Sequence, residues 1–142
     1  MKSFHISDVL SVTTGRLVSC RHMEGIYDIL NFLTGDNLFT HQLPRAGREC
    51  EPWLRTQFPQ LFPDQPLIAL ALTRLDELME DGDTREDRAA KITKWVEELR
   101  TVLELPEQIP VYEMDEEMHT HIDPVEELGA MIGDQKVIKV QL

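Results

Sequence analysis

The chain has little of several residue types, and each shortage removes a class of protein. Its 142 residues include only two cysteines, Cys20 and Cys50, neither in a C-x-x-C pattern, so a disulfide framework and a cysteine zinc site are both excluded. The longest apolar run, Leu67 to Leu72, falls far short of the ~20 residues of a membrane span. The N-terminus, MKSFHISDVL, lacks the apolar segment of a signal peptide. We therefore expect a soluble, cytoplasmic protein with no membrane contact.

Basic residues are also scarce. The 14 lysines and arginines face 26 acidic residues, which gives a net charge of −12. This balance argues against a broad basic face, so no direct binding to nucleic acid is expected. Residues 1–71 hold seven acidic and six basic residues, whereas residues 72–142 hold 19 and eight. The excess thus lies in the second half, as a solvated face or as an interaction surface.

The sequence also lacks the common motifs of catalytic and nucleotide-binding sites. The chain contains no G-x-S-x-G, no P-loop, no G-x-G-x-x-G and no internal repeat. Its length fits one domain, residues 1–142, that is large enough to bury a core. We therefore expect no enzymatic activity and no cofactor, and the oligomeric state stays open.

The first half of the chain reads as short helices separated by turns. Apolar residues at helical spacing predict a helix over 23–33 that ends at Gly35, after a shorter helix that ends at Gly15. Gly25 lies inside the longer helix and costs about 1 kcal/mol relative to alanine, which is either noise or the mark of a close backbone approach. Pro44 opens a further helix, which Pro52 should break or kink.

The middle of the chain predicts a helical hairpin. An apolar helix over 67–79 ends before Gly82, and Thr84 to Asp87 resembles a capping box. The helix that follows carries apolar residues at helical spacing as far as Leu103, and Pro106 lies just beyond. Because only a few residues join these two helices, they should pack antiparallel.

The end of the chain has the features of strands around one more helix. The sequence predicts strands over 109–114 and 136–142, with 2–6 as a candidate third strand. Between the first two, a helix begins at Asp123 and Pro124 and ends at Gly133. The predicted fold is α+β, a mostly helical single domain with a small two- or three-stranded sheet near the C-terminus. The predicted core comprises Ile26, Leu30, Leu33, Leu70, Leu75, Leu78, Ile92, Val96, Leu99, Val125, Leu128, Ile138 and Val140.

Residues 36–48 form a connector with no periodicity, and they are the first candidate binding site. Their polar side chains suit a ligand or a phosphate, whereas Leu38, Phe39 and Leu43 favour packing onto the core. The candidate binding residues here are Asp36, Asn37, His41, Gln42 and Arg45.

Histidines and a cysteine suggest two enzyme-like or ligand-binding alternatives. His119 and His121 form a His-x-His pair that can chelate a transition metal, but a solvated loop is the favoured explanation and no metal is predicted. Cys20 lies near a helix start, where a thiol pKa falls, and His22 or His41 would be its partner. The region of His22, His41 and Arg45 is a further candidate for a small enzyme or a ligand-binding site. The competing interpretation of Cys20 is a small apolar residue.

The acidic second half of the chain is the second candidate binding surface. Dense acids can imitate a nucleic-acid backbone and occupy a basic groove on a partner. The helix over 85–103 argues against a purely anionic face, because basic side chains are interspersed with its acids. The acids without such compensation include the candidate contact residues Glu113, Asp115, Glu116 and Glu117.

Two stretches carry a resemblance to a known family. Residues 5–45, HISDVLSVTTGRLVSCRHMEGIYDILNFLTGDNLFTHQLPR, and residues 121–140, HIDPVEELGAMIGDQKVIKV, resemble a family of small uncharacterised bacteriophage and prophage proteins. The resemblance transfers no catalytic residue. It implies a bacterial host cytoplasm and an accessory protein that binds a host protein or complex and inhibits a host defence complex, in the manner of anti-CRISPR proteins. The alternatives are a small enzyme or ligand- or metal-binding protein and a virion assembly component.

Overall fold

A two-stranded antiparallel sheet joins the beginning of the chain to its last third. The computed structural model describes the backbone of residues 1–141 and the side chains of residues 1–132. Strand β1 (Lys2–His5) pairs with β2 (Gln108–Val111). In this register Phe4 lies opposite Ile109, and both side chains are buried. The predicted strands 2–6 and 109–114 are therefore confirmed in essence, but they pair across the molecule rather than forming a sheet near the C-terminus.

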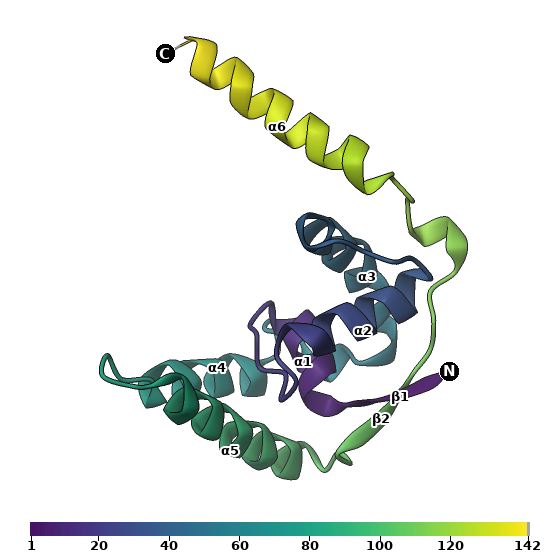
Figure 1. The fold of residues 1–142 in the computed structure, drawn as a ribbon. Helices are drawn as coiled ribbons and strands as arrows, with labels where there is room; N and C mark the ends of the chain where they lie inside the picture. The colour runs from purple at the N-terminus through teal and green to yellow at the C-terminus, as the bar shows by residue number, and fades with distance from the viewer. Residues whose placement is uncertain (142) are drawn as a thin grey trace.

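Three helices follow β1 and form the centre of the molecule (Figure 1). They are α1 (Ile6–Thr14), α2 (Met23–Thr34) and α3 (Leu43–Gln57), with the short 3-10 helices η1 (Thr40–Gln42) and η2 (Pro59–Leu61) before and after α3. Gly15 and Gly35 end α1 and α2 in the left-handed conformation, with φ of 72° and 70°, as their positions predict. Pro52 lies inside α3 without ending it, and Leu54, two residues further on, is fully buried in the core.

Helices α4 (Pro66–Leu78) and α5 (Arg85–Leu103) form the predicted antiparallel hairpin on one side of this centre (Figure 1). Thr84 and Asp87 make the predicted capping box: each side chain accepts the other residue's backbone N–H. The Trp95 indole N–H donates to Ala71 O at 2.7 Å and joins the two helices.

The chain then passes η3 (Glu116–Met118) and ends in α6 (Pro124–Gln141), which extends away from the other helices (Figure 1). Asp123 caps α6 as predicted, since its Oδ1 accepts the N–H groups of Val125 and Glu126. The predicted strand over 136–142 is wrong through residue 141, which is helical, and Leu142 lies outside the described residues. Among residues 1–141, each helix is too short or too polar to cross a lipid bilayer.

The core is a single cluster to which β1, β2 and the five helices α1–α5 contribute. The predicted core residues that are buried are Leu30, Leu33, Leu75, Val96 and Leu99. Those that pack against it partly buried are Ile26, Leu78 and Ile92. Those that are exposed, contrary to prediction, are Leu70, Val125 and Leu128. Ile138 and Val140 lie outside the described side chains.

The three exposed residues have two different physical reasons. Leu70 lies on α4, which is apolar around most of its circumference, so the side that carries Ile68 and Leu75 is buried and Leu70 stays in solvent. Val125 and Leu128 lie on α6, beyond the point where the chain leaves the core.

Candidate functional site

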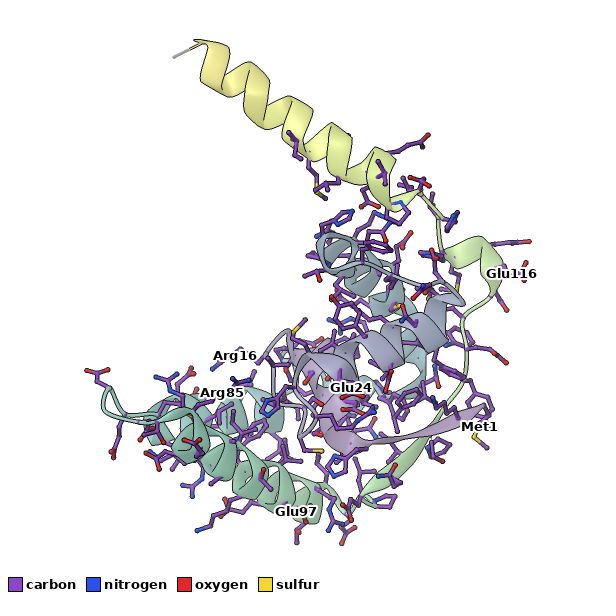
Figure 2. The ribbon with its side chains drawn as sticks, viewed as in Figure 1. Met1, Arg16, Glu24, Arg85, Glu97 and Glu116 are labelled. Atoms are coloured by element: carbon purple, nitrogen blue, oxygen red, sulfur yellow. The ribbon has the colours of Figure 1, made fainter. Side chains whose placement is uncertain are left out.

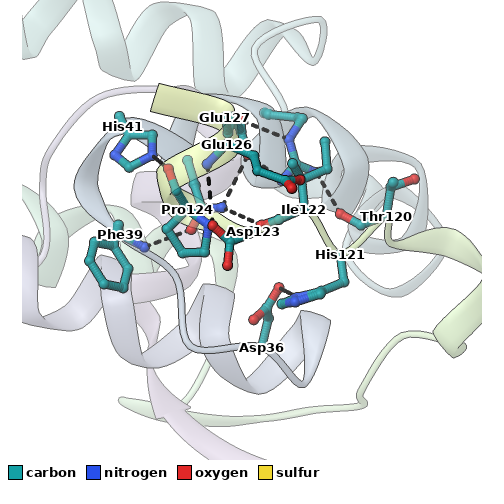
Figure 3. Close-up of polar contacts among 12 residues, drawn as sticks. Asp36, Phe39, His41, Thr120, His121, Ile122, Asp123, Pro124, Glu126 and Glu127 are labelled. Atoms are coloured by element: carbon teal, nitrogen blue, oxygen red, sulfur yellow. Dashed lines mark hydrogen bonds and ion pairs between the residues drawn. The ribbon is translucent and has the colours of Figure 1, made fainter. Parts of the chain in front are cut away.

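A network of hydrogen bonds holds residues 119–127 against η1 and the start of α3 (Figure 3). We call this network the clasp. It brings together residues about 80 positions apart in the sequence. Its members are Asp36, His41, Gln42, Arg45 and Glu49 on one side, and His119, Thr120, His121, Ile122, Pro124 and Glu127 on the other.

The strongest contact in the clasp joins Arg45 to Glu127 in the first turn of α6. The guanidinium donates from Nε to Oε2 at 3.0 Å and from a terminal nitrogen to Oε1 at 2.8 Å, so the pair is bidentate. Arg45 also donates to Glu49 and to Thr120 O. The hydrogen bond with Arg45 lowers the pKa of Glu127, and the same bond raises the pKa of Arg45.

Gln42 and His41 fix the backbone at the start of α6. The Gln42 amide is 1% exposed, and its nitrogen donates to Ile122 O and to Glu127 Oε1 while its oxygen accepts the Phe39 N–H. His41 Nε2 lies 2.8 Å from Pro124 O (Figure 3). The Gln42 bonds give both the nitrogen and the oxygen of this buried amide a partner within the chain. Gln42 therefore has a structural role and is not a ligand contact.

The two weak candidates for metal ligands, His119 and His121, both reach Asp36. Nε2 of His119 and Nδ1 of His121 lie 2.9 and 2.8 Å from Asp36 Oδ2, and Nδ1 of His119 lies 2.8 Å from Glu49 Oε1. A neutral imidazole has one N–H, so only the protonated His119 ring donates to both carboxylates. Burial alone would raise the pKa of Asp36, but hydrogen bonds with the histidines and with the Asn37 N–H outweigh it and lower that pKa to about 2.

A second polar network lies where α1 meets α2. The Asp8 carboxylate is fully buried and accepts from Ser19 Oγ at 2.5 Å and from Arg21 at 2.8 Å. Arg21 also donates to Asp28, and these partners, Asp8 above all, raise the pKa of Arg21. A Cβ on Gly25 would collide with Ser19 Oγ and with the Asp8 carboxylate. The glycine therefore marks a close approach, between its backbone and the side chains of Asp8 and Ser19, and its position is not noise.

Helix α6 presents apolar side chains to solvent just beyond the clasp. They recur at helical spacing along one side of the helix, and Val125 is 77% exposed. The exposed apolar residues are Val125, Leu128, Met131 and Ile132, which we call the α6 stripe.

The acidic stretch of residues 113–117 is anchored by its backbone, and its carboxylates point outward. The N–H of buried Met114 donates to Leu33 O at 3.1 Å, which leaves the acids on either side in solvent, and Figure 2 shows Glu116 directed away from the body. The exposed members of this stretch are Glu113, Asp115, Glu116 and Glu117.

A groove of about 530 Å³ lies between α1, α2 and α3. Its lining is mainly apolar and includes the charged residues Arg16, Arg48 and Glu51. Arg48 is exposed and makes no ion pair within the part of the chain whose side chains are described.

Residues 4–63 match a domain of unknown function, DUF7736. The match covers fewer than half of the 142 residues, from the third residue of β1 through η2. The whole groove and one side of the clasp lie within the DUF7736 match, whereas the α4–α5 hairpin, β2 and α6 lie outside it. No curated protein and no solved structure gives a significant match to the chain.

The clasp accounts for most of the predicted binding residues in the DUF7736 segment. Asp36, His41, Gln42 and Arg45 converge as predicted, but their partners are other parts of this chain, whereas the Asn37 side chain is exposed. Glu49 and Glu127 escaped the sequence analysis as members of the clasp, because Glu127 lies 82 positions from Arg45 and Glu49 reaches His119 70 positions away.

The cysteine and His22 do not join this network. Cys20 is exposed and Cys50 is buried, and burial raises the pKa of the Cys50 thiol to about 12. His22 precedes α2 with a φ of 57° and makes no side-chain capping bond. Among the described side chains no hydrogen bond joins His22 to His41 or Arg45, and a site formed by these three residues stays a prediction.

Proposed function

We propose that this chain is a non-enzymatic binding protein that docks α6 onto a partner protein. The observation that carries the proposal is the α6 stripe on a helix whose first turn is fixed by the clasp. Removing apolar surface from water is the main driving force of protein association. A partner that covers the stripe would gain that free energy.

The clasp supports this proposal because it orients α6 before any partner arrives. Arg45 and Gln42 together hold Glu127 through three hydrogen bonds, and His41 holds the first residue of α6 through Pro124 O. A helix that is already ordered loses less conformational entropy on binding than a flexible tail. The fixed start of α6 therefore favours recognition in the manner of a helix laid into a groove.

The charge around α6 indicates the chemistry of the partner. Glu126 lies on α6 next to the stripe, and the acidic stretch of residues 113–117 precedes the clasp. A groove with an apolar floor and a basic rim complements both features, and opposite charge would speed the encounter. We therefore propose a partner with such a groove.

The biological setting of the proposal comes from the resemblance of residues 5–45 and 121–140. It suggests a phage-type accessory protein in a bacterial cytoplasm, with a host protein as the partner and a host defence complex as the target of inhibition. The acidity of the second half, which suits a basic groove, is consistent with this setting.

The test compares the wild type with a matched pair of substitutions. Leu128→Asp places a charge in the α6 stripe, and Val102→Asp places one at an exposed position of α5 outside it. Proteins captured from bacterial lysate are identified, and the one that depends on Leu128 is purified and titrated. We expect Leu128→Asp to weaken binding about tenfold or more, since a buried unpaired charge is costly, and Val102→Asp to bind like wild type. Equal binding by both variants would refute the proposal.

The acidic contribution has its own control. The same titration at low and high salt, with Glu113, Glu116 and Glu117 reversed to lysine, measures it. If neither the salt concentration nor the charge reversals change the affinity, the partner has no basic rim. The apolar contact with α6 would then be the only part of the proposed interface that remains.

A second candidate function rests on the groove in the DUF7736 segment. Its volume of about 530 Å³ and its mainly apolar lining are typical of small-molecule sites, and Arg48 offers an anion contact. A probe with an alkyl chain and a carboxylate, decanoate, should bind the wild type and an Arg74→Gln control alike, and Arg48→Gln more weakly. Absence of binding by calorimetry would dismiss this candidate.

A further inference from the structure

We propose that His5, Glu97 and Glu107 form a binding site for a divalent transition-metal ion of the Zn²⁺ type. One possible ligand atom from each of these residues lies within 4.8 Å of the other two. His5 ends β1, Glu97 lies on α5, and Glu107 immediately precedes β2. The site thus joins three elements that the fold already holds side by side.

The surroundings of His5 let its ring exchange a hydrogen bond for a metal bond. Nε2 lies 3.3 Å from Glu107 Oε1. At the other nitrogen, Nδ1, Ser7 offers both an acceptor, Oγ at 2.7 Å, and a donor, its backbone N–H at 3.1 Å. When Nε2 carries the proton, it donates to Glu107 and Nδ1 accepts the Ser7 N–H. When Nδ1 carries the proton, it donates to Ser7 Oγ and leaves the Nε2 lone pair for an ion, as outer-sphere partners do for metal-bound histidines.

The ligand set suits zinc more than magnesium or calcium. One imidazole and two carboxylates form the mixed nitrogen and oxygen set of many Zn²⁺ sites, whereas Mg²⁺ and Ca²⁺ prefer oxygen alone. Arg100 takes Oε2 of Glu97 at 2.7 Å, and Oε1 has no hydrogen-bond partner among the side chains described. That oxygen is the one available to an ion.

A cavity beside the cluster leaves space for the remaining coordination positions. It measures about 200 Å³ and is lined by the three proposed ligands together with Ser7 and Cys20. Three protein ligands with open positions are what zinc sites that keep a bound water show. The site needs no part of α6 and is independent of the proposed docking.

Calorimetry with ZnCl₂ on the chelator-treated full chain tests the site, with MgCl₂ in parallel. We expect one zinc ion per chain, no magnesium binding, and a loss of zinc affinity of about tenfold or more in Glu107→Gln and Glu97→Gln. Glu98→Gln, one residue along α5, is the matched control and should bind zinc as the wild type does. Zinc should also raise the melting temperature of wild type and Glu98→Gln but not of Glu107→Gln.

The clasp histidines supply the competing explanation for any zinc uptake. His121 is exposed and lies beside Asp36, so His121→Ala separates the two sites. Zinc binding that is abolished by His121→Ala, or that survives in both Glu97→Gln and Glu107→Gln, overturns the proposal. So does a wild type that takes up no zinc.

Discussion

At the scale of single residues, Gly25 and Asp36 are constrained most by their neighbours. A side chain on Gly25 has no room, because Asp8 and Ser19 fill the space that its Cβ would occupy. Asp36 is constrained by charge, since two histidine rings and a backbone N–H converge on its carboxylate. Each constraint predicts a measurable effect of one substitution.

Gly25→Ala should destabilise the protein by about 1–3 kcal/mol, because the added methyl forces apart a buried hydrogen bond. Gly47→Ala is the control. It also lies in a helix, α3, and a Cβ there meets nothing within 4 Å, so it should stabilise by up to about 1 kcal/mol. Urea unfolding measures both, and a Gly25→Ala variant as stable as wild type would contradict the crowding at this position.

The stability that Asp36 contributes should depend on pH. Its pKa falls from 3.8 to about 2 on folding, so its contribution is fully present above its unfolded pKa and is lost as the pH falls through about 2. The shift corresponds to up to about 2 kcal/mol. The difference in unfolding free energy between wild type and Asp36→Asn should be largest near pH 5 and less than half as large near pH 2.5. A difference that is constant with pH would show that the histidines do not stabilise the charge.

At the scale of secondary-structure elements, local sequence predicted the hairpin well and the end of the chain poorly. The α4–α5 hairpin follows from Thr84, Asp87 and the apolar spacing of α5, all of which act within a few residues. Residues 136–141 were expected to form a strand because they are rich in β-branched side chains. They continue α6 instead, and Gly133 lies inside that helix. Propensity is a weak prior when no second strand is near enough to pair.

The clasp should control how firmly the first turns of α6 are held. Glu127→Gln keeps the shape of the side chain but removes the charge that Arg45 binds, so we expect a loss of about 1–3 kcal/mol. Amide hydrogen exchange over residues 124–132 should accelerate. Glu126→Gln, one residue away and exposed, should leave the exchange unchanged. If both variants exchange like wild type, the clasp does not hold α6.

At the scale of the whole molecule, the DUF7736 segment shares its core with the rest of the chain. Phe4 packs in the same buried cluster as Ile109 and Val96, both outside the match. The backbone is joined in the same way, since Ile6 N–H donates to Glu107 O at 2.8 Å. The family match therefore does not mark the limits of an independent folding unit.

A fragment of residues 1–64 should consequently lose cooperative unfolding, because β1 lacks its partner strand and the core loses the buried face of α5. Circular dichroism during urea titration would show a broad transition in place of a sharp one. Addition of the complementary fragment, residues 65–142, should restore the sharp transition. A fragment that unfolds as sharply as the full chain would show that the matched segment is autonomous.

The contacts that sequence analysis missed are those with the largest separation along the chain. The sequence identified Arg45 and Gln42 as candidate binding residues. Their partners, Glu127 and the Ile122 carbonyl, lie about 80 positions away and were not identified. His5 and Glu97 are likewise far apart in the sequence although they lie close together in the structure. Periodicity and capping report only on neighbours within a turn or two, and a single sequence contains no signal that pairs distant residues.

The antiparallel pairing of Lys2 with Val111 has a consequence for the way the protein is made. A ribosome adds about 5–20 residues per second, so the first strand of the chain waits several seconds before its partner has been synthesised. During that interval Phe4 and the unpaired strand edge are open to other nascent chains. Efficient production in cells would then depend on translation speed and on chaperones that shield the N-terminus.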